Sequence, residues 1–245
     1  MRKRLEPLLC ELHAHTRWSD GSLSIGELVD LHGRHGVDVL CVTDHVVRSD
    51  DPWREVEGVE LRAVEEETWE RYLAEIEREA TRARALYGML VVPGLELTFN
   101  DHDPGKAAHA VAVGLRTFVS VESGIAEAMR TAADEGTAIV AAHPFERSDT
   151  ADSALRLTCG FAENPRLREL AHRFELFNRS NLFGWIADEG LPAVAGGDFH
   201  RPEHLAGWRP LVPCAPSEEA LVAYLRSPRP VYLTRLDAAP TRAAA

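Results

Sequence analysis

The chain contains 245 residues, of which 45% are hydrophobic and 27% are charged, proportions typical of a soluble globular protein. No apolar stretch approaches the roughly 20 residues that a membrane-spanning helix needs, and the apolar part of the basic N-terminus MRKRLEPLLC is too short for a signal peptide. The formal net charge of −12 argues against nucleic acid as a partner, because polyanions are bound by basic surfaces. We therefore expect a cytoplasmic protein that has no contact with membranes. A small anionic substrate is compatible with this charge, since bound divalent cations can reverse the local sign.

Four cysteines are widely separated and form no C-x-x-C pair. Cys10 and Cys41 lie in apolar runs, where a free thiol packs as a small hydrophobic group. Disulfide bonds are rare in the cytoplasm, so we expect four free thiols.

Short apolar runs alternate with helical patterns along the whole chain. Most of these runs are apolar throughout, as expected for strands that are covered on both faces. They predict strands at 8–12, 37–43, 89–95, 108–115, 137–142, 173–178, 191–197 and 230–234.

Helices are predicted between these strands. Ser24 and Glu27 have the spacing of a capping box at the start of the first helix, which ends near residue 36. Apolar residues at helical spacing predict a long helix over 65–87 that Gly88 ends. Three further helices are predicted at 121–135, at 181–189 after an Asn181 cap, and at 217–226 after a Ser217 cap.

This alternation favours an α/β barrel with parallel strands over an open sheet. No linker, repeat or low-complexity segment divides the chain, so we expect a single barrel domain over residues 1–236. Two long insertions are expected near 48–66 and 145–172, and the tail 237–245 is expected to be disordered.

Ionisable residues gather where the predicted strands end. Each lies at or near the C-terminal end of a run, except His109, which opens its run. The C-terminal ends of parallel barrel strands converge on one mouth, where active sites form. The residues concerned are His13, His15, His45, Glu96, His109, His143, Asp198 and His200, together with Asp20 close to the first strand.

Imidazole and carboxylate groups together bind zinc, iron or manganese. Nine such groups exceed the needs of one ion and suit two or three ions, with a hydroxide shared between metals as the nucleophile. The remaining histidines are not assigned to this site. His32 and His35 are expected on the surface of the first helix, and His102, His172 and His204 in loops or on the surface.

Four motifs in sequence order resemble the PHP (polymerase and histidinol phosphatase) domain family. They are the H-x-H…S-D-G stretch at 13–21, T-D-H at 43–45, the His-Pro pair at His143, and GGDFH at 196–200. The resemblance spans about residues 8–205. It implies a distorted seven-stranded (β/α)7, TIM-like barrel with a trinuclear metal cluster and metal-dependent hydrolysis of phosphoesters.

The resemblance also implies how the ligands divide among the ions. His13 and His15 would share one ion with Glu96 and Asp198, and Glu96 would bridge to a second ion. His109 and His143 would hold this second ion, with His109 favoured over His102 because it adjoins an apolar run. The third ion would be held by Asp20, His45 and His200, which would also assist the departing alkoxide as catalytic residues.

Two further acidic residues are expected close to the ligands. Glu175 resembles a family position near the site, either as an outer ligand or as a hydrogen-bond partner of a ligand. Asp44 is interpreted as an acceptor for the N–H of a ligand imidazole.

Arginine suits a bidentate grip on phosphate. Proximity to the motifs makes Arg17, Arg147, Arg179 and Arg201 candidate substrate-binding residues, with Lys106 behind them. The sequence therefore predicts a metal-dependent phosphoesterase that hydrolyses a small phosphorylated metabolite, such as a nucleotide, histidinol phosphate or a sugar phosphate. The alternatives are a nuclease acting on nucleic-acid ends, an amidohydrolase of C–N bonds, and a non-catalytic metal-bound scaffold.

Overall fold

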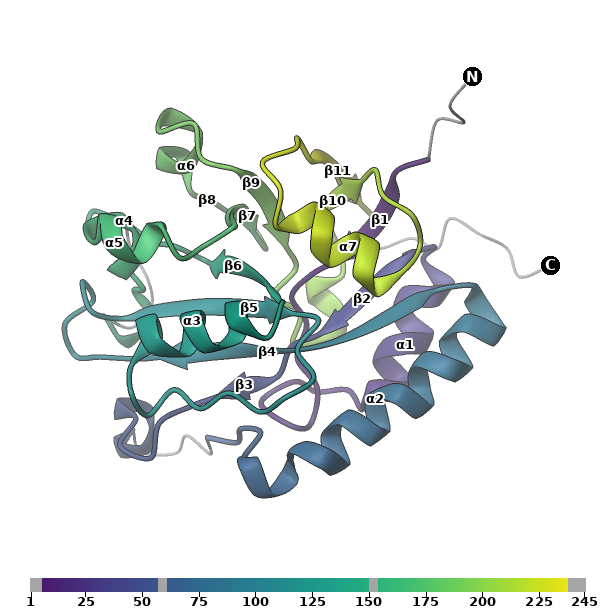
Figure 1. Cartoon of the computed structure of the whole chain (residues 1–245), viewed down its shortest axis with the longest axis horizontal. Helices are drawn as coiled ribbons and strands as arrows, with labels where there is room; N and C mark the ends of the chain where they lie inside the picture. Colours follow the sequence, from purple (N-terminus) through teal and green to yellow (C-terminus); the bar gives the residue numbers. More distant parts are fainter. Residues whose placement is uncertain (1–5, 57–60, 150–153, 238–245) are drawn as a thin grey trace.

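The computed structural model describes residues 6–56, 61–149 and 154–237. Within these residues a curved eleven-stranded sheet follows the order β11-β10-β1-β2-β4-β5-β6-β7-β8, with β3 paired to β4 and β9 paired to β7 (Figure 1). The strands are β1 (Leu8–Glu11), β2 (Val39–Val42), β3 (His45–Val46), β4 (Leu90–Phe99), β5 (Ala108–Val113), β6 (Ala138–Ala142), β7 (Arg173–Asn178), β8 (Asn181–Leu182), β9 (Ala193–Gly196), β10 (Gly207–Val212) and β11 (Tyr232–Leu236).

Helices lie against this sheet. The α-helices are α1 (Ile25–Arg34), α2 (Glu66–Tyr87), α3 (Ile125–Asp134), α4 (Gly160–Glu163), α5 (Pro165–Arg168), α6 (Gly184–Asp188) and α7 (Glu218–Leu225). Three short 3₁₀ helices are η1 (Pro52–Glu55), η2 (Ala154–Arg156) and η3 (Pro202–His204). Helices α1 and α2 lie side by side, and α3 packs along β4, β5 and β6 (Figure 1).

Local capping signals explain where the main helices begin and end. The Ser24 side chain accepts from the N–H of Glu27, and the Glu27 carboxylate accepts from the N–H of Ser24, which confirms the capping box of α1. Gly88 ends α2 with a φ of 67°, a conformation that glycine adopts without a Cβ penalty. Ser217 caps α7 as predicted.

The prediction at 181–189 was wrong in its first part. Asn181 pairs in β8 instead of capping a helix, and α6 starts only at Gly184. The short strands β3 and β8 and the strand β10 were not predicted.

The sheet is a curled half-barrel of mixed strand direction, so the α/β class is confirmed but an all-parallel barrel is not. Strands β1, β2 and β4 are parallel, as are β6, β7 and β9. Strand β5 runs antiparallel to both β4 and β6, and a single parallel bridge joins Ala14 to Phe199. The number of seven β/α units is not confirmed.

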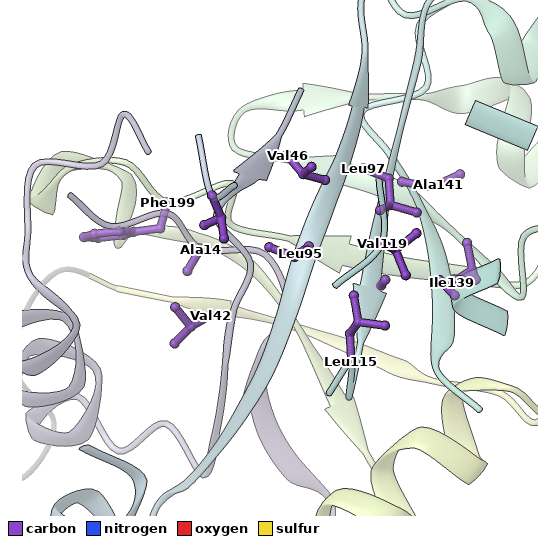
Figure 2. Close-up of a cluster of buried hydrophobic side chains, with 14 of the residues drawn as sticks. Ala14, Val42, Val46, Leu95, Leu97, Leu115, Val119, Ile139, Ala141 and Phe199 are labelled. Carbon is purple, nitrogen blue, oxygen red and sulfur yellow. The ribbon is translucent and has the colours of Figure 1, made fainter. Parts of the chain in front are cut away.

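Apolar side chains on the two faces of the sheet form two buried clusters. Leu95 and Leu97 of β4 pack with Ile139 and Ala141 of β6 on the face covered by helices (Figure 2). The alternate residues, among them Val92, Val111 and Val140, form the second cluster, which α7 closes with Leu221, Tyr224 and Leu225. Because strand side chains alternate between faces, Glu96 lies opposite Leu95 and Leu97 and shares its face with Val92.

The two predicted insertions and the tail are only partly described. The first contains η1 and the second contains η2, α4 and α5, while residues 57–60, 150–153 and 238–245 lie outside the described ranges. All four cysteines are buried free thiols. No helix among the described residues is long and apolar enough to cross a membrane.

His32 and His35 are buried, so their predicted place on the surface of α1 was wrong. His32 continues the stripe of Ile25, Leu28 and Val29, whose i, i+3, i+4, i+7 spacing marks the buried face of a helix. Its ring packs against Phe199 at a centroid distance of 5.0 Å.

Candidate metal centre

The nine predicted metal ligands converge at one edge of the sheet. Eight of them form three groups, each with ligand atoms within 4.8 Å of one another. The groups are His13, His15 and Glu96; Glu96, His109 and His143; and His15, Asp20, His45 and His200. Asp198 adjoins the first group and the third, because its Oδ1 lies 3.5 Å from His15 Nε2 and 3.3 Å from His200 Nδ1.

The central group is buried and contains polar atoms without partners. His13 Nε2 and His15 Nε2 each lie 3.3 Å from Glu96 Oε2. These three atoms are buried and make no hydrogen bond of acceptable geometry in the described part of the chain, although Glu96 Oε2 also lies 2.8 Å from His45 Nδ1. A buried polar atom without a partner costs about 1–3 kcal/mol, so three of them converging on one point fit a bound cation.

The second group includes His109, which lies near Glu96 and His143 because β5 runs antiparallel to β4 and β6. His143 follows β6, and its Nε2 lies 3.1 Å from Glu96 Oε1. His109 opens β5, and its Nδ1 lies 3.1 Å from the same oxygen. Because β5 is antiparallel to its neighbours, its first residues lie where β4 and β6 end, which is why His109 is near the start of its strand.

The third group lies toward the solvent. Asp20 Oδ1 is 3.5 Å from His45 Nε2, and Asp20 Oδ2 is 3.1 Å from His200 Nε2. The Asp20 side chain is 46% exposed, whereas His15, which faces the same group, is fully buried. Asp20 is therefore the candidate ligand most open to an incoming substrate.

Electrostatics place several groups in the protonation state that binds a metal. Burial lowers the pKa of His15, and the nearby rings of His200 and His45 lower it further, to about 3. Burial opposes ionisation of Glu96, but His45 and His13 outweigh it and hold the pKa of this carboxyl well below its usual range. Burial also opposes a charge on His45, but Glu96 and Asp20 outweigh it and raise its pKa to about 9. Glu96 and Asp20 thus favour a positive charge at His45, and a bound cation competes with a proton for this ring.

Buried acceptors hold the ligands in place. Glu175 Oε1 lies 2.9 Å from His13 Nδ1, and Glu175 Oε2 accepts from the N–H of His143 at 2.8 Å. This is the geometry of a hydrogen-bond partner that orients a ligand, one of the two roles predicted for Glu175. Asp44 accepts from Ser19 Oγ at 2.6 Å, and Ser19 Oγ lies 3.4 Å from His15 Nδ1. The prediction that Asp44 bonds a ligand imidazole directly was therefore wrong, since Ser19 stands between them.

Backbone conformation marks the same edge of the sheet. Among the described residues, three that are not glycine have a positive φ: His143 at 28°, Arg179 at 50° and Asp198 at 42°. Such conformations cost of order 1–3 kcal/mol each and concentrate at functional sites. These three residues follow β6, β7 and β9, so the strain coincides with the ligand cluster.

Of the four predicted substrate-binding arginines, only Arg179 contacts the cluster. Its Nη2 lies 3.0 Å from Asp198 Oδ2 and 2.8 Å from His200 Nδ1. Arg147 pairs with Glu163 and Asp103. Arg17 pairs with Glu27, and Arg201 Nε lies 3.2 Å from His204 Nε2.

A cavity of about 470 Å³ opens beside Arg179. Its walls include His204, Trp208 and Arg235. The structure thus brings His204 to the edge of the site, because His204 Nδ1 accepts from the N–H of His200 at 3.1 Å. From the sequence, His204 was expected in a loop or on the surface, and this contact was not predicted. His102 is exposed, as expected.

Several residues that support the site were not predicted as functional. Glu11 Oε1 accepts from the N–H groups of His13 and Gly197, at 3.1 and 2.9 Å. Arg209 Nε lies 2.6 Å from Glu11 Oε2, and both side chains are fully buried. A charged residue inside the first apolar run was the only signal for Glu11 in the sequence.

No model of a known protein family matches the chain, and no curated protein matches it. Among solved structures it is similar to a two-domain protein from Bacteroides vulgatus that contains a predicted PHP-like metal-dependent phosphoesterase. The TM-score is 0.60 and the identity 17%, over 96% of this chain and 69% of that chain.

The chain has a PHP-like fold.

Two other similar structures have lower TM-scores. One is a Bifidobacterium adolescentis protein suggested to be a metal-dependent phosphoesterase, with a TM-score of 0.45 and 17% identity over 78% of this chain and 87% of that chain. The other is an amidohydrolase from Chromobacterium violaceum, with a TM-score of 0.49 and 17% identity over 79% and 88%.

Proposed function

We propose that this protein is a metal-dependent phosphoesterase that hydrolyses a small phosphomonoester. The observation that carries the proposal is the meeting of His13 Nε2, His15 Nε2 and Glu96 Oε2, three buried atoms that make no hydrogen bond of acceptable geometry among the described residues, inside a cluster of nine imidazole and carboxylate ligands. A structural metal site needs only four ligands to one ion. A cluster of this size therefore supports a reactive centre over a metal-bound scaffold.

The residues present fit two or three divalent ions of manganese, iron or zinc. One would be held by His13, His15, Glu96 and Asp198, and a second by Glu96 together with His109 and His143. Asp20, His45 and His200 would hold a third. When bound, such ions neutralise charge on phosphoryl oxygens and supply a nucleophile from water at neutral pH.

The side chains of the protein supply orientation and proton transfer. Arg179 can direct its guanidinium to a phosphoryl oxygen, because Asp198 and His200 hold it at the edge of the cavity. Asp20 Oδ2 lies 3.1 Å from His200 Nε2 and is open to solvent. A proton from solvent can therefore reach a departing alkoxide through the Asp20 oxygen that does not hold the ion.

The cavity favours a small substrate over a polymer. Its volume of about 470 Å³ lies within the range of small-molecule sites. The net charge of −12 disfavours nucleic acid, which is bound by basic surfaces. The described residues that line this cavity include none of the nine candidate ligands, and Arg179 is the residue that joins it to the cluster. We therefore place the phosphate of a nucleotide, histidinol phosphate or sugar phosphate between Arg179 and the cluster, with the alcohol part beside Trp208.

The test compares wild-type protein with the double variant His13→Ala, His15→Ala, each loaded with Mn²⁺. Wild-type protein is expected to release phosphate from p-nitrophenyl phosphate, and the double variant is expected to lose this activity while keeping its circular dichroism spectrum. Equal turnover by the two proteins would contradict the proposal. Faster hydrolysis of amides or of single-stranded DNA than of any phosphomonoester would favour the amidohydrolase or nuclease alternatives, and inertness toward all substrates would favour the scaffold.

A further inference from the structure

A short chain of buried hydrogen bonds contacts His109 at Nε2, the ring nitrogen that does not face Glu96. It begins at Asp51, in the insertion after β3. Asp51 Oδ1 and Oδ2 lie 3.2 and 3.1 Å from Asn100 Nδ2. Asn100 Oδ1 lies 2.9 Å from His109 Nε2. Asp51 and Asn100 are only 1% and 2% exposed, so water does not compete for these contacts.

This chain fixes the orientation of the Asn100 amide. An ionised carboxylate only accepts hydrogen bonds, so the amide atom that faces both oxygens of Asp51 must be the NH₂ group. The amide oxygen of Asn100 then faces His109 Nε2. An oxygen can only accept at this contact, and His109 Nε2 must therefore carry a proton.

The opposite ring nitrogen is left to the candidate metal centre. In a neutral imidazole with a proton on Nε2, Nδ1 has a free lone pair. His109 Nδ1 lies 3.1 Å from Glu96 Oε1, and His143 Nε2 lies 3.1 Å from the same oxygen. Two lone pairs at this distance repel each other, and a cation bound by both the nitrogen and the carboxylate oxygen removes this repulsion.

We propose that Asp51 and Asn100 are positioning residues that fix the tautomer of His109 and so direct its Nδ1 at a divalent cation shared with Glu96 and His143. The inference rests on the proposed metal centre and assigns a role to the insertion that carries Asp51. Hydrogen bonds from a ligand imidazole to a neighbouring acceptor typically change metal affinity 10–100-fold.

The local backbone is anchored independently of the Asn100 side chain. Arg48 Nη2 donates to the backbone oxygen of Asn100 at 2.8 Å, and its guanidinium lies over the ring of Phe99 at 4.0 Å. Asp51 also caps η1 by accepting from the N–H of Trp53 at 2.9 Å. A change confined to the Asn100 amide therefore tests the bond to His109 while the backbone contact made by Arg48 remains.

The first experiment titrates metal-free full-length protein with Mn²⁺ and measures stoichiometry and affinity by calorimetry. Asn100→Leu removes the acceptor for His109 and is expected to weaken one ion 10–100-fold, while Asn181→Leu, at an exposed position on β8, is expected to match wild type. The double variant Asp51→Asn, Asn100→Asp exchanges the amide and the carboxylate. It retains both the bond between them and an acceptor for His109 Nε2, so we expect its affinities within threefold of wild type. Unchanged binding by Asn100→Leu, or a folded exchange variant no tighter than Asn100→Leu, would overturn the proposal.

A second measurement needs no variant. In Zn²⁺-loaded wild-type protein, long-range ¹H–¹⁵N spectra should show the His109 proton on Nε2, and a proton on Nδ1 would refute the inference. These readouts are separate from catalysis. Normal ion binding without phosphate release would remove the proposed phosphoesterase function and leave the positioning role intact, whereas a wild-type protein that binds no ion would remove both.

Discussion

Gly197 lies directly against the carboxylate of Glu11, and its N–H donates to Glu11 Oε1 at 2.9 Å. A Cβ at Gly197 would collide with Glu11 Oε2, just as a Cβ at Gly196 would collide with the carboxylate of Glu175. Both carboxylates also bond His13, at its backbone N–H and at its ring. Because Gly196 and Gly197 have no side chains, the end of β9 can approach Glu11 and Glu175, the two carboxylates that bond His13.

Gly197→Ala should disturb the ligand cluster through this contact. The new methyl group must push Glu11 or the chain that carries Asp198, and overpacking of this kind costs typically 1–3 kcal/mol. We expect a lower free energy of unfolding in urea and at least a tenfold loss of phosphate release. Gly184→Ala is the matched control, because a Cβ there meets nothing within 4 Å. Equal stability and activity of the two variants would show that the close approach of Gly197 to Glu11 has no role.

The pairing of α1 with α2 should weaken in acid. Burial, the largest single effect, raises the pKa of Asp30, but hydrogen bonds from Arg82 at 2.6 Å and Tyr87 at 2.9 Å together outweigh it and lower the pKa. A carboxyl group whose pKa falls on folding stabilises the folded state above its unfolded pKa of about 3.9, and this stability is lost as the pH falls through the folded value.

Asp30→Asn removes this effect and is expected to cost about 1 kcal/mol near pH 7, because the pair is partly exposed and screened. The difference from wild type should shrink as the pH falls below about 4, as measured by urea unfolding across the pH range. Asp134→Asn, at the exposed end of α3, serves as a control that should follow wild type. A difference that stays constant down to pH 3 would exclude ionisation of Asp30 as its cause.

The site could be predicted from the sequence where its geometry is local. His13 and His15 lie close together because a short extended segment carries both, and GGDFH places Asp198 at the end of a strand for the same reason. The capping signals at Ser24 and Gly88 act within a single turn of helix. Each of these features depends on residues that are neighbours in the chain.

The features that could not be predicted depend on pairing between distant segments. The direction of β5, which explains why His109 opens its strand, is set by its register with β4 and β6. The ion pair of Glu11 with Arg209 joins the first strand to β10, which was not recognised as a strand. Periodicity describes one element at a time and contains no information about such partners.

Removal of metal should destabilise the wild-type protein. An ion that binds only the folded state stabilises it by roughly 2.7 kcal/mol at a free concentration 100 times its Kd, which corresponds to about 5–10 °C in Tm for a chain of this size. Differential scanning calorimetry with and without a chelator measures this shift. In the double variant His13→Ala, His15→Ala we expect the shift to be at least halved. A wild-type Tm that does not respond to chelator or to added Mn²⁺, Fe²⁺ or Zn²⁺ would contradict the metal centre.

Arg179 and Arg147 offer a direct comparison of two arginines predicted to bind substrate. Arg179 is held by Asp198 and His200 at the cavity, with its Nε donating to the backbone oxygen of Asp198 at 2.9 Å. Arg147 is 57% exposed and its guanidinium pairs with two surface carboxylates. The geometry therefore favours Arg179 as the group that meets a phosphate.

Arg179→Ala should lower kcat/KM for a phosphomonoester roughly 10–150-fold, since a hydrogen bond from a charged group contributes about 1.5–3 kcal/mol. Arg179→Lys keeps the charge but not the planar fork, and we expect it to recover only part of the loss. Arg147→Ala should remain within about twofold of wild type, because its ion pairs are exposed and screened. Steady-state kinetics on the three variants, each checked for equal metal content, distinguishes these outcomes. A larger loss in Arg147→Ala than in Arg179→Ala would contradict this assignment. It would indicate that the substrate binds near the segment that follows β6 instead of near the ends of β7 and β9.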